Sequence, residues 1–162
     1  MSVLVTPRLI IRPLAPDNLD VLHVFSNDPE VIRYVGDGQP LDRATTAQWI
    51  ANAAASLPRT GLGSRAVVLA ASDELIGWAG MVARDDEPNP ELIYGFAKQH
   101  WGQGYATEAA RAVLETRDGR PVDATIDPEN AASRRVLDKL GFGPVAMEVD
   151  EDGLPTLRLR LV

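Results

Sequence analysis

Two glycines separated by one residue, Gly102 and Gly104, are the feature of this sequence best suited to binding a ligand. They lie where an apolar run that ends at Phe96 gives way to a helical pattern. Glycine adopts positive φ readily and has no Cβ, so successive backbone N–H groups in such a loop can converge on one anion. We therefore interpret the stretch from Trp101 to Ala109 as a phosphate cradle, with a plain turn at a helix entry as the alternative.

The residues after the glycines predict the helix whose first turn would complete this cradle. Apolar residues recur at the spacing i, i+3, i+4, i+7 and i+8, namely Ala106, Ala109, Ala110, Val113 and Leu114. The unpaired N–H groups and the positive dipole end of such a helix would face the ligand. The stretch has neither the Gly-Lys-Ser/Thr of a nucleotide-triphosphate loop nor the Gly-x-Gly-x-x-Gly of a dinucleotide fold. The pattern thus favours a phosphate held without a dedicated lysine and magnesium.

Composition excludes several classes of protein and site. The chain has 162 residues, a formal net charge of −7, two histidines and no cysteine. The lack of cysteine excludes disulfides, thiolate metal sites and a cysteine nucleophile, and two histidines argue against a histidine-rich metal site. An acidic chain is poorly suited to nucleic acid or an anionic membrane, and an amine substrate suits it better.

The length and the apolar runs predict a cytoplasmic protein with one domain over residues 1–162. A chain of this size buries a core of its own. No apolar run approaches the roughly 20 residues of a membrane span. Met1–Leu4 lack the basic and apolar layout of a signal peptide.

Strands and helices must position the cradle. Apolar and β-branched runs between turn residues predict strands over residues 8–12, 66–70, 75–82, 91–97, 122–126, 144–149 and 157–161. Helical spacing predicts helices over residues 18–26, 45–57 and 131–140, the cradle helix from Ala106, and a short turn near residues 29–32. We expect Asp17 and Asn130 to cap helices, and Ala132, Val136 and Leu140 to form the apolar face of helix 131–140.

The order of these elements predicts the fold class. Strand 91–97, the cradle helix and strand 122–126 form a strand, helix, strand unit whose length implies a right-handed crossover and parallel pairing. The remaining strands follow one another through short turns, which predict hairpins. The expected fold is therefore a mixed α/β (α+β) sheet, mostly antiparallel with one parallel pair, flanked by helices.

Four separated segments resemble the GNAT superfamily of acyl-coenzyme A-dependent N-acetyltransferases, most closely the branch that acetylates the N-termini of ribosomal proteins. The segments are Thr6–Leu14, Asn27–Val31, Trp101–Ala109 and Asn130–Phe142, in the expected order along nearly the whole chain. The resemblance implies the GNAT fold, in which the strand before the cradle splays from its parallel neighbour. It also implies direct acetyl transfer from acetyl-coenzyme A to a primary amine, without a metal or a covalent enzyme intermediate.

The resemblance assigns the cradle to the pyrophosphate of acetyl-coenzyme A, held by backbone N–H groups from about Gly102 to Ala106. The family's pattern is Gln or Arg, two residues, Gly, one residue, then Gly or Ala, so Trp101 departs from it. The pantetheine arm pairs with the exposed edge of the splayed strand in the family. The coenzyme-binding residues implied are Phe96, Ala97, Lys98, Trp101, Gly102, Gln103, Gly104, Tyr105, Ala106, Thr107, Asn130 and Ser133.

Acetyl transfer to an amine requires removal of an ammonium proton, a polarised thioester carbonyl and a proton for the leaving thiolate. Glu91, at the start of the cradle strand, is the candidate base, with a solvated carboxylate as the alternative. Tyr94 either places its hydroxyl in the acceptor cleft or packs in the core. Ser133 either acts beside the thiol or serves the helix entry. Leu137 stands where many GNAT enzymes have a proton-donating tyrosine, and leucine cannot donate.

The sequence leaves three functional hypotheses. The acceptor is a protein N-terminal amine in the first, and a small amine, polyamine or aminoglycoside in the second. In the third, the chain is a coenzyme A-binding module without catalysis, a hypothesis that Leu137 keeps open. A homodimer is expected from the family alone.

Overall fold

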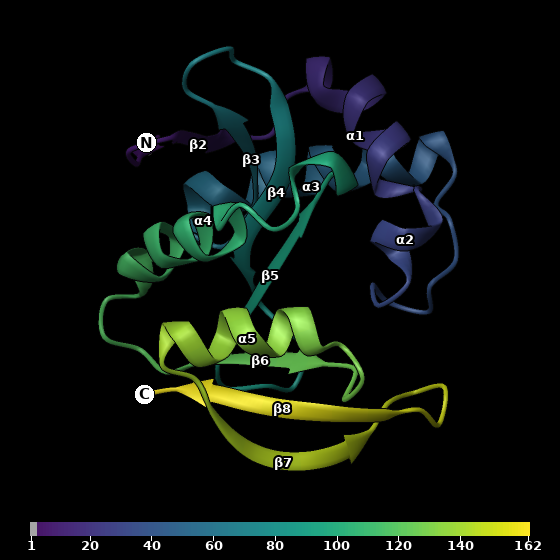
Figure 1. Ribbon diagram of the computed structural model, residues 1–162, viewed down its shortest axis with the longest axis vertical. Coiled ribbons are helices and arrows are strands. Elements are labelled where there is room, and N and C mark those ends of the chain that lie inside the picture. The colour runs from purple at the N-terminus through teal and green to yellow at the C-terminus, as the bar shows by residue number, and fades with distance from the viewer. Residues whose placement is uncertain (1–2) are drawn as a thin grey trace.

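The computed structural model describes residues 3–162 and has an eight-stranded sheet with helices on both faces (Figure 1). The strand order is β1-β2-β3-β4-β5-β6-β8-β7, and every neighbouring pair is antiparallel except β5 and β6. This confirms the expected fold class and the parallel crossover through the cradle helix. Met1 and Ser2, on which the signal-peptide prediction partly rests, lie outside the described residues.

The elements have the following bounds. The strands are β1 (Leu4–Val5), β2 (Leu9–Pro13), β3 (Gly63–Leu69), β4 (Leu75–Val82), β5 (Glu91–Phe96), β6 (Val122–Ile126), β7 (Gly143–Val149) and β8 (Pro155–Leu161). The α-helices are α1 (Leu19–Ser26), α2 (Pro29–Ile32), α3 (Arg43–Thr60), α4 (Tyr105–Leu114) and α5 (Ala131–Leu140), and 3₁₀ turns cover Pro16–Asn18, Lys98–His100 and Glu115–Arg117. Within residues 3–162, every helix is too short or too polar to span a bilayer.

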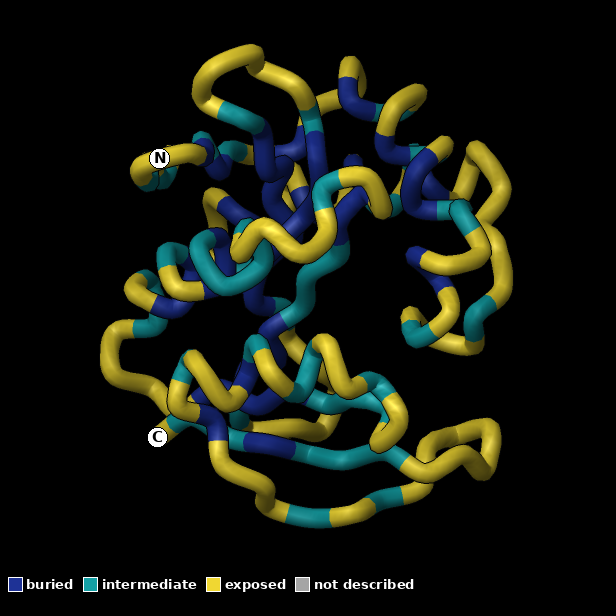
Figure 2. The backbone as a smooth tube through the Cα atoms, viewed as in Figure 1, coloured by how far each residue is buried: buried dark blue, intermediate teal, exposed yellow. Residues whose placement is uncertain are grey.

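Two apolar cores lie on opposite faces of the sheet. On one face, α4 and α5 cover apolar residues of β5 and β6 such as Leu92 and Val122. On the other face, α1 and α3 cover Trp78 of β4, which stacks on Phe25. Figure 1 shows α4 and α5 in front of the sheet and α3 behind it, and Figure 2 shows the central strands buried while β7 is largely exposed. The cradle strand β5 is therefore fixed from both sides.

Gly95 shows how closely these layers pack on β5. A Cβ at this residue would lie 2.2 Å from atoms of the Trp78 ring, well inside van der Waals contact. Only glycine at this position lets the indole lie across the strand. The packing therefore explains a glycine in the middle of a strand, where it is otherwise unfavourable.

Side-chain caps explain why α3 is longer than the predicted helix 45–57. The Asp42 carboxylate accepts the N–H of Thr45 at 2.7 Å and starts the helix at Arg43. Gly61, with φ of +72°, ends it in the left-handed conformation. The helix thus extends by two residues at its N-terminus and three at its C-terminus.

Two predictions about helices were wrong. Asp17 does not cap α1, because the chain enters through a 3₁₀ turn in which the Asn18 side chain accepts the N–H of Ala15 at 2.9 Å. On α5, Ala132 is exposed and Leu137 is the fully buried residue, so the apolar face is rotated from the predicted one. This rotation turns Leu137 into the core, where it packs beside α4 and β6 residues.

The remaining differences between the predicted strands and those of the structure come from strand pairing, and not from local sequence. β3 begins at Gly63 instead of residue 66, because Gly63 already pairs with Met81 of β4. β8 begins at Pro155, opposite Val149 of β7. The two-residue strand β1, which the sequence did not predict, pairs with β2.

Candidate functional site

The glycine loop has the backbone conformation that the sequence predicted. Gly102 and Gly104 have φ of +76° and +81°, and Gly104 is the N-cap of α4. A Cβ built on Gly102 would meet no heavy atom within 4 Å, so the space beside it is open. Both glycines are therefore required by conformation, and the loop leaves room for a ligand.

Six successive N–H groups at this loop have no hydrogen-bond partner among the described residues. From Gly102 to Thr107, none donates a hydrogen bond to any atom of residues 3–162, and the first amide of the helix to do so is that of Glu108, to the Gly104 carbonyl at 3.1 Å. Free N–H groups at a helix N-terminus, together with the helix dipole, bind anionic oxygens. The loop can thus hold a phosphate or pyrophosphate by backbone atoms alone.

β5 leaves its parallel neighbour immediately after they meet. The two strands pair only at Glu91 and Asp123, and Figure 1 shows β5 running diagonally away from β6. The N–H of Ala97 bonds Ile76 of β4 at 2.9 Å, so the alternation along the strand turns the backbone groups of Tyr94 and Phe96 toward β6. No residue of β6 pairs with either. An open strand edge therefore runs from Glu91 to the cradle.

The predicted edge residues differ in what they offer a ligand. The backbone of Ala97 already has partners, because its N–H bonds β4 and its carbonyl accepts the N–H of His100 at 3.0 Å. The Phe96 carbonyl accepts the indole N–H of Trp101 at 2.8 Å. This bond folds the half-exposed Trp101 back onto the end of β5, which explains how tryptophan is accommodated at the start of the loop. The Lys98 ammonium pairs with Glu30 of α2.

Tyr94 and Ser133, predicted separately, meet in one hydrogen bond. The two hydroxyl oxygens are 2.5 Å apart and join β5 to the first turn of α5. Asn130 caps α5 by accepting the Ser133 N–H at 3.1 Å, which fixes the serine backbone. Burial raises the pKa of the Tyr94 phenol to about 12, against a smaller lowering effect of the Ser133 hydrogen bond. Tyr94 therefore keeps its proton at neutral pH.

Glu91 lies apart from this pair, at the closed end of the splayed strands. Its side chain is 8% exposed, and its two oxygens accept hydrogen bonds from Arg84 Nε and Thr125 Oγ1. The hydrogen bond with Glu91 raises the pKa of the Arg84 guanidinium. Because side chains alternate along a strand, Glu91 and Tyr94 project from opposite faces of β5. The structure thus does not bring the candidate base and the two hydroxyls together.

The comparisons with known proteins agree with this geometry. Residues 8–143 match the acetyltransferase (GNAT) domain family. The chain belongs to the GNAT acetyltransferase family. A relative from Aspergillus fumigatus, FsC-acetyl coenzyme A-N(2)-transacetylase, is 33% identical over 120 residues, which cover 67% of this chain and 49% of that protein.

Two solved structures show how far the likeness extends. An acetyltransferase from Agrobacterium tumefaciens is 26% identical, has a TM-score of 0.85, and covers 100% of this chain and 95% of its own. RimL, a ribosomal L7/L12 α-N-protein acetyltransferase in complex with coenzyme A, has a TM-score of 0.82 at 16% identity, covering 99% of this chain and 98% of its own. The resemblance to the GNAT family is thus confirmed, and the protein is an acyltransferase.

Two residues of this GNAT domain that reach the cradle were missed by the sequence analysis. Arg8 and Thr6, from the segment before β2, contact Gln103 and Glu108. The sequence placed Thr6 and Arg8 in one family segment and Glu108 in another, without a role for any of the three. The available signal was a positive charge, Arg8, in one family segment and a negative charge, Glu108, in another.

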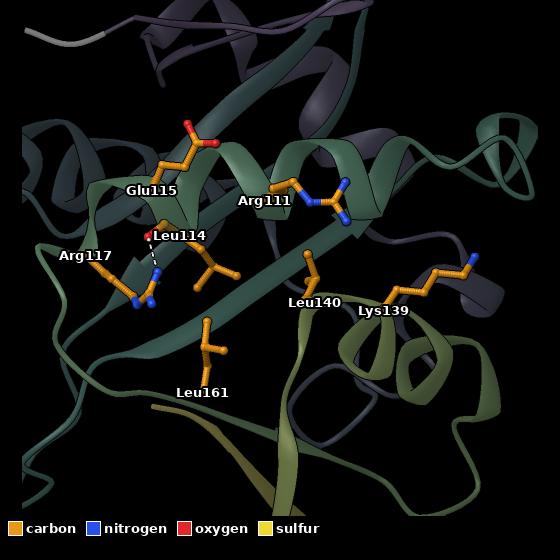
Figure 3. A pocket seen from close by; sticks show the side chains of 7 residues that line it. All are labelled: Arg111, Leu114, Glu115, Arg117, Lys139, Leu140 and Leu161. Carbon is orange, nitrogen blue, oxygen red and sulfur yellow. Dashed lines mark hydrogen bonds between the residues drawn. The ribbon is translucent and has the colours of Figure 1, made fainter.

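One hollow of the GNAT domain lies at the other end of α4 from the cradle. A cavity of about 210 Å³ is lined by Arg111, Leu114, Glu115, Arg117, Lys139, Leu140 and Leu161. Figure 3 shows the three leucines between Arg117 on one side and Arg111 and Lys139 on the other, with the Glu115 carboxylate pointing away. None of the predicted site residues lines it.

Proposed function

We propose that this enzyme binds acetyl-coenzyme A along the open edge of β5 and transfers its acetyl group directly to a primary amine. The observation that carries the proposal is the continuity of the open edge with the cradle. An unpaired strand edge suits an extended arm with amide groups, and six free N–H groups at its end suit a pyrophosphate. The family match and the coenzyme A complex of RimL support this proposal.

The residues that would hold the coenzyme divide into two groups. The N–H groups of Gly102 to Thr107 would bind the pyrophosphate, since none has a partner among residues 3–162. The backbone of Tyr94 and the N–H of Phe96 would pair with the pantetheine arm, because both face the open edge. The Phe96 carbonyl already accepts the indole N–H of Trp101. Ser133 is linked to this edge by its hydrogen bond with Tyr94, and Asn130 accepts the Ser133 N–H.

The chemistry requires two proton movements. Acetyl-coenzyme A supplies the acetyl group, and its C–S bond breaks as the amine nitrogen forms the new C–N bond. We assign the proton for the departing thiolate to the Tyr94 phenol, with Ser133 as the group that orients it and relays its replacement. Glu91 remains the proposed acceptor of the ammonium proton, on the opposite face of β5 and through water, since its oxygens are already hydrogen-bonded.

Two classes of acceptor follow from different observations. The fold it shares with RimL supports a protein N-terminal amine. The second class, a small amine, stays in the proposal beside the 33% identity to a fungal protein named as an acetyl coenzyme A-N(2)-transacetylase. The net charge of −7 suits a cationic acceptor of either class.

Release of free thiol from acetyl-coenzyme A tests this function. The purified chain is incubated with acetyl-coenzyme A and a panel of peptides with free N-termini, polyamines and aminoglycosides. We expect amine-dependent thiol release, greatest for one class of acceptor. Binding of coenzyme A without amine-dependent release would refute catalysis, and the lack of binding by calorimetry would return the cradle to a structural turn.

A further inference from the structure

We propose that Arg8, near the N-terminus, is a positioning residue of the pyrophosphate cradle, which it holds in the binding conformation. The inference rests on the proposed function of the same loop. Arg8 is 95 residues from Gln103, the loop residue whose carbonyl it binds. It precedes β2, so the first part of the chain braces a loop formed by its centre.

The Arg8 side chain makes three separate contacts with the cradle and its helix. Its Nη1 donates to the Gln103 carbonyl at 2.9 Å, and its Nε donates to the Glu108 carboxylate at 2.7 Å. Its guanidinium lies 4.3 Å from the centre of the Tyr105 ring, within the range of a cation–π interaction. Arginine is suited to this task because its planar fork donates in fixed directions.

The bond to Gln103 decides where the next amide points. The carbonyl of Gln103 and the N–H of Gly104 share one peptide bond and point in opposite directions from it. Because Arg8 holds the carbonyl on its own side, the Gly104 N–H is directed to the other side of the loop. The Gly104 amide is one of the six without a partner among the described residues. Arg8 therefore sets the direction of a donor that it does not touch.

Glu108 fixes Arg8 in this position. Its Oε1 accepts hydrogen bonds from the Thr6 hydroxyl at 2.6 Å and from the Arg8 N–H at 2.9 Å, and its Oε2 accepts the Arg8 Nε. Desolvation raises the pKa of Glu108, but the hydrogen bonds from Thr6 and Arg8 outweigh it and lower the pKa below the ordinary value. Glu108 is thus a carboxylate at neutral pH, with its side chain 15% exposed.

Arg8 also offsets a charge that would oppose the ligand. Glu108 lies in the first turn of α4, where its negative charge competes with a pyrophosphate for the positive end of the helix. The stretch from Trp101 to Thr107 contains no lysine or arginine that would neutralise it. Arg8, with its side chain 44% exposed, supplies that charge at the cradle. Loss of the Arg8 side chain would leave the Gly104 amide misdirected and the Glu108 carboxylate without a cationic partner.

The test compares two acetyl donors, acetyl-coenzyme A and S-acetylpantetheine, which lacks the pyrophosphate. Arg8→Met keeps the length of the stem but loses the charge and the donors. Arg12→Met is the matched control, because Arg12 lies in β2 and pairs with Asp73. We expect Arg8→Met to raise the KM for acetyl-coenzyme A, and the Kd for coenzyme A, about tenfold. The kcat/KM for S-acetylpantetheine should stay within about twofold of wild type, as should every constant of Arg12→Met.

The outcomes separate this inference from the proposed function. Equal losses with both donors would show a merely structural role for Arg8, and unchanged constants would show no role, so either result overturns the inference alone. A wild-type chain that neither binds coenzyme A nor turns over acetyl-coenzyme A overturns both proposals. If Arg8→Met does not fold at the assay temperature, Arg8→Lys carries the same comparison, because it keeps the charge and loses the fork that binds Gln103.

Discussion

At the scale of single residues, the hydroxyl pair of Tyr94 and Ser133 carries the most direct test of the chemistry. Tyr94→Phe removes the proposed proton donor while keeping the ring that packs on the core. General acid catalysis contributes about a hundredfold or more, so kcat with acetyl-coenzyme A and a saturating amine should fall by about 10². Thiol release gives the rate, and calorimetry with coenzyme A should give an unchanged Kd.

The raised pKa of Tyr94 also predicts a pH dependence. A phenol with a pKa of about 12 stays protonated through the working range, so the wild-type rate should not fall between pH 8 and about pH 10 through loss of this proton.

Ser133→Ala removes the hydrogen bond with Tyr94 and should lower kcat by less than Tyr94→Phe does. A Tyr94→Phe variant with the wild-type kcat would exclude the phenol as the acid.

The proposed base requires a comparison of pH profiles. Glu91→Gln should lower kcat/KM most at low pH, where the amine is protonated and needs a proton acceptor. Thr125→Val is the control, because it removes one hydrogen bond of Glu91 and leaves the carboxylate. If Glu91 serves only to join β5 and β6, the two variants will lower the rate equally at every pH.

At the scale of elements, the cradle depends on glycine at the N-cap of α4. Gly104→Ala places a Cβ at φ of +81° and 3.5 Å from Arg8 Nη2, and Gly119→Ala places one at φ of +72° with no atom within 4 Å. Each should lose about 1 kcal/mol of unfolding free energy through the left-handed strain. Only Gly104→Ala should raise the KM for acetyl-coenzyme A, because only that loop carries the free amides. Urea unfolding and steady-state kinetics measure the two effects, and an equal KM in both variants would contradict the assignment.

At the scale of the whole molecule, Asp123 joins β6 to β8. Its carboxylate, with a side chain 2% exposed, accepts hydrogen bonds from Arg160 at 2.6 and 2.9 Å and from Arg158 at 3.0 Å. Arg158 also pairs with Glu148 of β7 and with Glu87 in the loop before β5. Asp123→Asn leaves two arginines without their shared charge and should lower the unfolding free energy by about 3 kcal/mol.

The pKa of Asp123 gives the pH range of this effect. The hydrogen bond from Arg160 is the largest of the causes that lower the pKa below its ordinary value of 3.8. A carboxylate with a lowered pKa in the folded state stabilises the fold above that ordinary value and loses the contribution as the pH falls through the folded value. The difference between wild type and Asp123→Asn in urea unfolding should therefore be full at pH 7 and shrink below about pH 4. A constant difference at pH 7 and pH 3 would exclude the charge as its source.

Much of the fold followed from local patterns. Alternation and helical spacing predicted every strand except β1 and every α-helix, because these periods record which side of an element meets the core. The conformation of Gly102 and Gly104 was also predictable, since few residues other than glycine adopt positive φ at low cost. Ends of elements were less predictable, as at α3, where one side-chain cap and the packing around it decide the length.

The sequence by itself therefore determined the sheet class, the conformation of the glycine loop and the family, all of which reside in contiguous segments. The tertiary structure decided which residues meet across the chain: Tyr94 with Ser133, 39 residues apart, and Arg8 with Gln103, 95 apart. It also decided that Ala97 bonds β4 and that Leu137 faces the core. The physical reason is that such pairings depend on strand register and on the rotation of each helix. Both are set by the packing of the whole core, and not by any one segment of sequence.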